Sequence, residues 1–281
     1  PCPAPPLPIL PTLPLLPFLV VEQADIANTP ATNVATHNNL LSLLKDFHDF
    51  CELNDVVYTL DGGSLLGAIR HKGFIPWDDD ADVSMTRDQF TKFKKALKNQ
   101  SKIKIHYHLW IPRVYFRDTD LDNFIFLDLF IYDHVPKSEI MKFVKRNLIL
   151  MLQGMMHNSY SPDGHHKTIL RVALFVLWLF GRIIPFGLKL SLYSVISRVR
   201  LYRSKHVSVY NDTYKRIAID RNVFDKNEFS NSIQIEFENT KFNIIQRYSG
   251  HLEKLFGDFM RLPPESMRKP EHFFTKNISI K

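Results

Sequence analysis

Four aspartates occur within five positions, at Asp78, Asp79, Asp80 and Asp82. Their charges repel one another unless something neutralises them, and carboxylate oxygens are the hard ligands that Mg²⁺ and Mn²⁺ prefer. Residues 80–85 predict the start of a short strand, in which side chains two residues apart point to one face. We therefore expect Asp80 and Asp82 to project together, as a metal-binding pair must. The alternative is a solvated acidic turn that precedes a strand.

A third carboxylate, Asp128, stands alone in the apolar run of residues 124–132. Burying an unpaired ionised carboxylate in such a strand is costly, unless a cation lies against it. The alternatives are a protonated or salt-bridged Asp128, or an edge strand that shows this face to water. Two aspartates on one strand and a third on a later strand can hold two divalent ions over a phosphate.

Backbone donors for a phosphate are expected just upstream of the aspartates. The strand predicted at residues 56–60 leads into Gly62, Gly63 and Ser64, and residues 65–70 start a short helix. A glycine-serine turn at a helix N-terminus presents N–H groups to an anion. Arg70 and Lys72 could add positive charge there, or be plain solvated cations.

These residues bear a strong resemblance to a known family. Residues 60–85, LDGGSLLGAIRHKGFIPWDDDADVSM, are similar to the signature of the LicD family, which includes bacterial phosphocholine transferases and fukutin-related proteins. A second family hallmark resembles FEN at residues 237–239 and LEKLFGDFMRLPPESMR at residues 252–268, with Phe256 in place of the usual tyrosine. The resemblance spans about residues 40–268.

The resemblance implies an α/β fold, a nucleotidyltransferase-like mixed sheet flanked by helices, with a helical apolar insertion. It also implies a function: metal-dependent transfer of a phosphorylated alcohol, phosphocholine or ribitol phosphate, from a CDP-linked donor to a glycan hydroxyl, releasing CMP. In this family the Gly-Ser turn, the Asp-x-Asp pair and the apolar-Asp-apolar strand form the site. The catalytic residues that also hold Mg²⁺ or Mn²⁺ would be Asp80, Asp82 and Asp128, and the substrate-binding residues Gly63, Ser64, Arg70, Lys72 and Glu238. Asp128 would in addition be a candidate to take the proton from the acceptor hydroxyl.

Composition limits the other classes. The chain has 281 residues and a net charge of +7, which permits nucleic acid, an anionic membrane or phosphorylated substrates as partners. It lacks a basic stripe interleaved with aromatic residues, so we expect no nucleic-acid partner. Its two cysteines, Cys2 and Cys51, exclude a disulfide framework and a cysteine-rich zinc site.

Helical spacing of apolar residues over 40–51 predicts an amphipathic helix that packs Cys51 into the core. Thr86 and Gln89 fit a capping box, which predicts a helix to about residue 97. The alternating strand at residues 103–109 places His106 and His108 on one face, where we expect exposure rather than metal binding.

The chain divides into a proline-rich leader, residues 1–33, expected to be disordered, and a LicD-like domain at residues 34–281. Residues 138–205 are predicted to be a helical insertion, with association with a membrane as one interpretation. Within them residues 169–199 are the most hydrophobic stretch, which Arg182 and Lys189 interrupt. Two interpretations remain: an interfacial helix pair with basic rims on a membrane, or a buried helical lid.

Other functions stay open at this point. The chain could polymerise nucleotides on RNA, act as a catalytically silent scaffold, or be a membrane-bound accessory subunit of a glycan-modifying complex. The resemblance favours a membrane-associated protein, in the Golgi lumen of a eukaryote or on the cytoplasmic membrane face of a bacterium.

Overall fold

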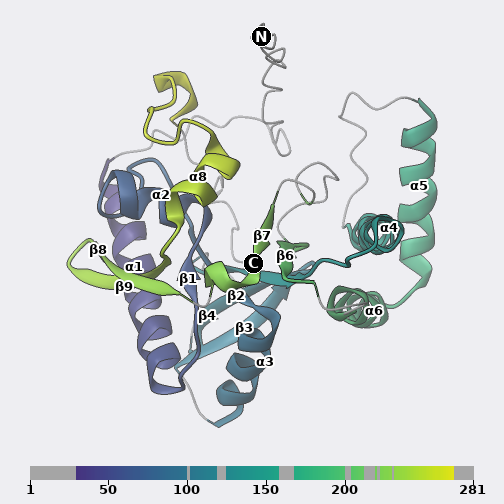
Figure 1. The fold of residues 1–281 in the computed structure, drawn as a ribbon, viewed down its shortest axis with the longest axis horizontal. Helices are drawn as coiled ribbons and strands as arrows, with labels where there is room; N and C mark the ends of the chain where they lie inside the picture. Colours follow the sequence, from purple (N-terminus) through teal and green to yellow (C-terminus); the bar gives the residue numbers. More distant parts are fainter. Residues whose placement is uncertain are drawn as a thin grey trace, which may run out of the picture.

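A mixed sheet forms the centre of the computed structural model (Figure 1). The structure describes residues 30–99, 102–118, 125–157, 168–199, 204–211, 219, 222–229 and 231–268. The strands of the sheet are β1 (Thr59–Leu60), β2 (Ala81–Thr86), β3 (Ile103–His108), β4 (Ile111–Phe116), β5 (Leu127–His134), β6 (His206–Val209) and β7 (Val223–Asp225). Their order is β1-β2-β5-β4-β3, with β6 joining β5 and β7 joining β6. A separate hairpin consists of β8 (Ser232–Phe237) and β9 (Thr240–Ile245).

Helices flank this sheet. They are α1 (Pro30–Leu53), α2 (Gly62–Arg70), α3 (Arg87–Ala96), α4 (Glu139–Met156), α5 (Thr168–Ile183), α6 (Phe186–Arg198) and α8 (Tyr248–Phe256), with short 3₁₀ turns at Leu97–Asn99, Lys226–Phe229 and Glu265–Met267. The expected mixed α/β sheet flanked by helices is therefore confirmed. Of the expected leader, residues 1–29 lie outside the described residues, and α1 already takes in residues 30–33.

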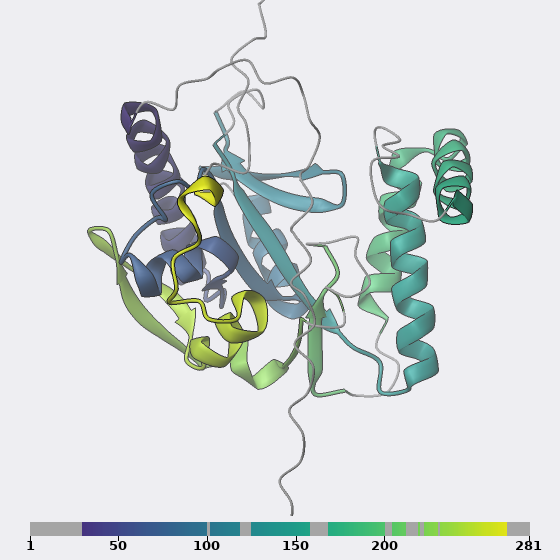
Figure 2. The ribbon, with the colours of Figure 1, turned by 90° about the horizontal axis from the view of Figure 1, so that it is seen from above.

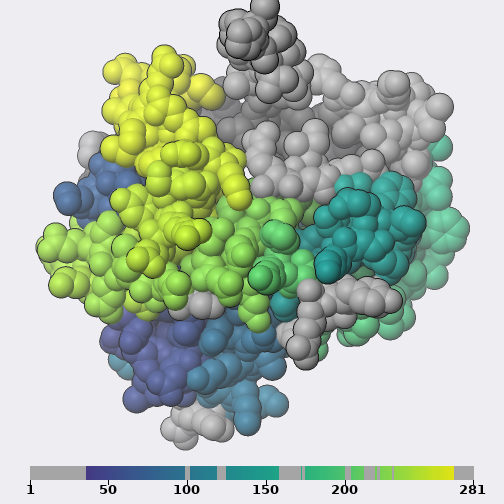
Figure 3. Space-filling view, in the orientation of Figure 1, coloured from purple at the N-terminus to yellow at the C-terminus, as the bar shows by residue number. Residues whose placement is uncertain are grey.

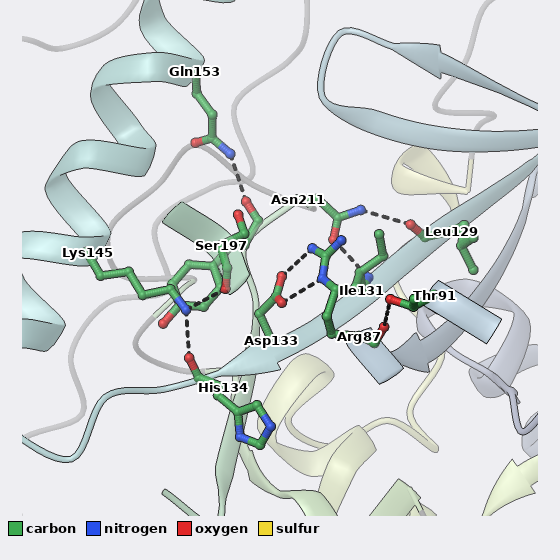
Figure 4. A network of polar contacts seen from close by, with 11 residues as sticks. Arg87, Thr91, Leu129, Ile131, Asp133, His134, Lys145, Gln153, Ser197 and Asn211 are labelled. Atoms are coloured by element: carbon green, nitrogen blue, oxygen red, sulfur yellow. Dashed lines mark hydrogen bonds and ion pairs between the residues drawn. The ribbon is translucent and has the colours of Figure 1, made fainter. Parts of the chain in front are cut away.

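Strand β5 is the axis of the sheet. Along one edge it pairs in parallel with β2, and this register sets Asp82 beside Asp128. Along the other edge β4 pairs with its first residues and β6 with its last. Between those two partners the side chain of Asn211 takes the place of a strand: its amide donates to Leu129 O at 2.8 Å and accepts from Ile131 N–H at 2.9 Å (Figure 4).

The main core confirms the helix expected over residues 40–51. Five side chains of α1 are at most 1% exposed: Leu40, Leu43, Leu44, Phe47 and Cys51. The capping box expected at Thr86 is wrong, because the Thr86 side chain makes no capping hydrogen bond and Gln89 instead accepts from Val57 N–H. The capping-box motif is not formed because the Gln89 side chain bonds to the backbone of Val57, which is distant in sequence. His106 and His108 are both exposed, as expected.

Helices α4, α5 and α6 follow β5 and precede β6 in the sequence, and they form a helical unit. This unit has a second core that includes Ile149, Leu152 and Tyr193. Figure 2 shows them grouped at one end of the molecule, with α1 and the β8–β9 hairpin at the other. Lys145 joins this unit to the sheet, since its ammonium donates to His134 O and Ser197 O (Figure 4). Burial lowers the pKa of Lys145 to about 8.

A second lysine corrects the sequence interpretation. Lys189, which was expected to contribute to a basic rim, is buried and donates to Met155 O and Gly181 O. Its charge therefore lies at the C-terminal ends of α4 and α5, where helix dipoles favour a cation.

Replacing Asn211 by alanine is expected to lower the free energy of unfolding by about 2–4 kcal/mol, because two buried backbone groups of β5 lose their partner. Urea unfolding of both proteins measures this. Asn39→Ala, at an exposed position of α1, is the matched control and should change stability by less than about 0.5 kcal/mol. Equal effects of the two substitutions would show that the amide does not substitute for a strand.

Candidate active site

Three carboxylates converge where β2 and β5 begin. Asp80 directly precedes β2, while Asp82 and Asp128 are the second residues of their strands. Each offers an oxygen, and these oxygens lie within 4.8 Å of one another. Asp82 and Asp128 are only 9% and 6% exposed. The structure thus brings together the three residues predicted to be catalytic. The alternative of a solvated acidic turn does not account for this convergence or for the burial of Asp82 and Asp128.

The cluster is electrostatically strained. Burial raises the pKa of Asp82 well above its usual range, and the negative charges of Asp80, Asp128 and Asp78 raise it further. The hydrogen bond from Gly63 N–H opposes this rise. A site that raises a carboxyl pKa by crowding like charges is a site where a cation is stabilised.

The start of α2 holds Asp82 in place. Gly63 N–H donates to Asp82 Oδ2 at 3.0 Å, and Ser64 Oγ accepts from Asp82 N–H at 2.8 Å. Both groups were predicted to bind phosphate. In this structure they instead position a carboxylate, and Ser64 is buried. Gly62, at φ +50°, comes so close that a Cβ there would overlap Asp82 Oδ2, so only glycine fits.

A buried network behind α2 escaped the sequence analysis. Asp61 caps α2 by accepting from Gly62 N–H, and also accepts from the Tyr132 hydroxyl at 2.9 Å. His251 Nε2 of α8 lies 2.8 Å from its other oxygen. Burial alone would raise the pKa of Asp61, yet the charge of His251 and these hydrogen bonds hold it below its ordinary value. The available signal was a lone aspartate that ends an apolar strand before two glycines.

Arg113 was also missed, and it contacts the cluster directly. Its Nε donates to Asp128 Oδ1 at 2.7 Å, and its guanidinium also reaches Oδ2 and lies 3.7 Å from the Phe126 ring centroid. Of the alternatives for Asp128, the salt-bridged one is correct. An arginine fork on both oxygens fixes the orientation of the carboxylate, and each oxygen keeps a further lone pair with which it can bind a cation.

The other expected substrate-binding residues lie elsewhere. Arg70 and Lys72 are at the C-terminal end of α2, about 12 Å along the helix from its glycines. Arg70 donates to Phe259 O and Arg261 O, and Lys72 is exposed. Glu238 accepts from Phe74 N–H and donates its own N–H to Lys72 O, so it shapes the turn after α2.

These contacts bring the two hallmark segments of the sequence together. Arg70 joins α2 to residues just beyond α8, and the Arg268 guanidinium lies 5.6 Å from the Trp77 ring centroid. Figure 1 shows α8 beside α2. Segments about 190 positions apart in the sequence, as for Arg70 and Phe259, therefore pack against each other.

Comparison with known proteins agrees with this arrangement. Residues 55–168 match the family model described as "LicD/FKTN/FKRP, nucleotidyltransferase domain". The chain carries a LicD family domain. The matched LicD domain contains the three carboxylates, the start of α2 and Arg113, while Glu238 and His251 fall outside it.

The relatives extend the similarity beyond the LicD domain. Over 252 residues the chain is 29% identical to the lipopolysaccharide cholinephosphotransferase LicD of Haemophilus influenzae, covering 83% of this chain and 92% of that protein. Uncharacterized proteins of Rickettsia typhi and Rickettsia prowazekii are 33% and 31% identical over 108 and 125 residues. Those matches cover 34% and 43% of the rickettsial proteins, and 36% and 44% of this chain.

Gly62→Ala is expected to lower the free energy of unfolding by about 1–3 kcal/mol, because alanine is strained at positive φ. It should also displace the Asp82 carboxylate, and calorimetry should then show weaker binding of any Mg²⁺ that the wild-type chain takes up. Gly187→Ala is the matched control, since a Cβ at Gly187 meets nothing within 4 Å; a helical alanine there should be neutral or stabilising by less than about 1 kcal/mol. Identical stability and Mg²⁺ binding in the two variants would contradict this account of Gly62.

Proposed function

We propose that this protein transfers phosphocholine from a cytidine-diphosphate-linked donor to a sugar hydroxyl of a glycan, releasing CMP. The observation that carries the proposal is the cluster of Asp80, Asp82 and Asp128, whose oxygens lie within 4.8 Å of one another. The similarity to a lipopolysaccharide cholinephosphotransferase over 92% of its length favours phosphocholine over ribitol phosphate. It also favours a lipopolysaccharide-type glycan as the acceptor.

The carboxylates fit a divalent cation, Mg²⁺ or Mn²⁺. Oxygen ligands around Mg²⁺ lie about 3–4 Å from one another, a spacing that three oxygens within 4.8 Å can adopt. The raised pKa of Asp82 is a further argument, because a cation would offset both the cost of burying its charge and the repulsion from its neighbours, which together raise that pKa. When bound, the cation would offset negative charge on the donor diphosphate and on the attacking oxygen.

Different residues of the chain would bind the cation and position its ligands. Asp80, Asp82 and Asp128 hold the cation. Gly63 and Ser64 fix Asp82 from the start of α2, and Arg113 fixes Asp128 from β4. The N-terminus of α2 points at the same place, where its dipole favours a phosphate of the donor.

The alternatives are less well supported. A scaffold that had lost catalysis would have no need to keep Asp80 crowded against Asp82 and Asp128, which are only 9% and 6% exposed, because such crowding of like charges costs stability. A polymerase acting on RNA would require a basic groove beside the aspartates. Arg113, which contacts the cluster, is instead engaged with Asp128, and Arg70 at the far end of α2 is engaged with backbone carbonyls.

The decisive experiment incubates the purified chain with CDP-choline, a lipopolysaccharide acceptor and Mg²⁺, and measures CMP by chromatography. We expect Asp82→Asn to lower CMP release by about 100-fold or more, the loss expected when a metal ligand is removed. Asp49→Asn, at an exposed position of α1, should leave the rate unchanged. CDP-ribitol in a parallel reaction tests the other donor.

Calorimetry provides a readout that needs no acceptor. CDP-choline should bind the wild-type chain in the presence of Mg²⁺ and bind weakly with a chelator or in Asp82→Asn. A folded chain that binds neither CDP-choline nor CDP-ribitol would overturn the transferase proposal and favour the scaffold. Preference for CDP-ribitol would keep the transferase and change the transferred group.

A further inference from the structure

The helical unit of α4, α5 and α6 carries an apolar surface that the rest of the described chain does not cover. Among the described residues 22 large hydrophobic residues are exposed, and 15 of them lie between Ile140 and Val195. On α5 they are Val172, Phe175, Val176, Leu179, Phe180 and Ile183. These positions recur every three or four residues, so they form one stripe along the helix. The buried-lid interpretation is therefore wrong for the outer face of α5.

The neighbouring helices continue this pattern. On α4 the exposed apolar residues are Ile140, Phe143, Val144, Leu148 and Met151, and on α6 they include Leu188, Leu192 and Val195. Both sets also follow helical spacing. Helix α4 packs against α5 and α6, and the space-filling view shows α4 at the surface with α5 along the margin of the molecule beside it (Figure 3). An exposed apolar surface of this extent marks an interaction site.

Charge indicates what the surface binds. The sequences of α4, α5 and α6 contain seven Lys and Arg residues and a single acidic residue, Glu139. Lys145 and Lys189 are buried and Lys142 pairs with Glu139, so the remaining positive charge of the surface comes from the arginines.

Two of the cations lie against aromatic rings at the stripes: Arg182 is 4.8 Å from the Trp178 ring centroid and Arg146 is 5.8 Å from that of Phe143. Apolar stripes bordered by arginine and tryptophan are typical of helices at the boundary of an anionic membrane.

The architecture favours lying on a membrane over crossing it. Among the described residues no single helix is long and apolar enough to span a bilayer. The segments Phe175–Ile183 and Phe186–Arg198 pass together by length and composition, but they are bent by 114°. Lys189 also fastens α6 to the ends of α4 and α5 through Met155 O and Gly181 O. The bent pair is thus part of a folded unit.

We propose that the α4–α6 surface docks in the plane of a lipid bilayer rich in anionic head groups. The stripes enter the boundary between head groups and acyl chains, and Arg146, Arg182 and Arg198 contact the lipid phosphates. A second copy of the chain fits less well. A two-fold interface places the same patch on both sides. The basic residues of the two copies would then face each other, and each copy would supply only one acidic residue, Glu139, to pair with them.

Vesicle co-sedimentation of the full chain tests the proposal. We expect wild type to bind vesicles of phosphatidylcholine with about 30% phosphatidylglycerol at least tenfold more tightly than vesicles of phosphatidylcholine alone, and added salt to weaken this preference. Phe180→Ser/Ile183→Ser should reduce partitioning about tenfold or more, because two exposed apolar side chains that would enter the bilayer are replaced by polar ones. The matched control, Leu53→Ser/Ile233→Ser, changes residues 85% and 40% exposed outside the unit and should bind like wild type.

Further readouts separate the outcomes. Brominated acyl chains should quench the fluorescence of Trp178, and the quenched component should vanish in Trp178→Phe. Asp82→Asn should bind vesicles like wild type, so failure of the proposed catalysis and failure of membrane docking are distinguishable. Absence of vesicle binding by wild type, or equal binding by Phe180→Ser/Ile183→Ser, would overturn the proposal. A dimer in light scattering that this double variant dissociates would assign the surface to a second copy.

Discussion

The constraint on which this structure depends is the crowding of like charges at the start of β2 and β5. Asp82 and Asp128 are set side by side by strand register, and Asp80 joins them from the position directly before β2. Such a cluster persists only if its surroundings hold every carboxylate in place. Backbone and hydroxyl groups of α2 hold Asp82, and Arg113 holds Asp128.

Support for the cluster reaches further into the fold. The N-terminus of α2 is itself fixed by Asp61, which Tyr132 of β5 and His251 of α8 contact in the interior. His251 directly precedes the C-terminal hallmark segment, which itself contacts α2 through Phe259 O and Arg70, so this part of the chain contributes to the site indirectly, by positioning α2. Its resemblance to the family therefore reflects the architecture around the aspartates, while the matched LicD domain itself ends at residue 168.

Strand β5 also connects the proposed active site with the proposed membrane-binding surface. Its first residues carry Asp128, and its last residues carry Asp133, which pairs with Arg87, and the His134 carbonyl that Lys145 binds (Figure 4). The proposed site and the proposed membrane surface are thus attached to opposite ends of one strand. A transferase that modifies a glycan on a lipid anchor would benefit from this, because membrane docking would keep the site at a constant distance from its acceptor.

The sequence by itself determined the mixed α/β sheet, the core helix over residues 40–51 and the convergence of Asp80, Asp82 and Asp128, because periodicity and a specific motif are local signals. It did not determine which groups pair with them. Arg113 faces Asp128 through the register of β4 with β5, His251 meets Asp61 across 190 positions, and Lys189 turns inward to helix carbonyls. Tertiary packing decided these contacts. The partner of a side chain depends on where distant segments of the chain lie, and the residues next to it in sequence do not specify those positions.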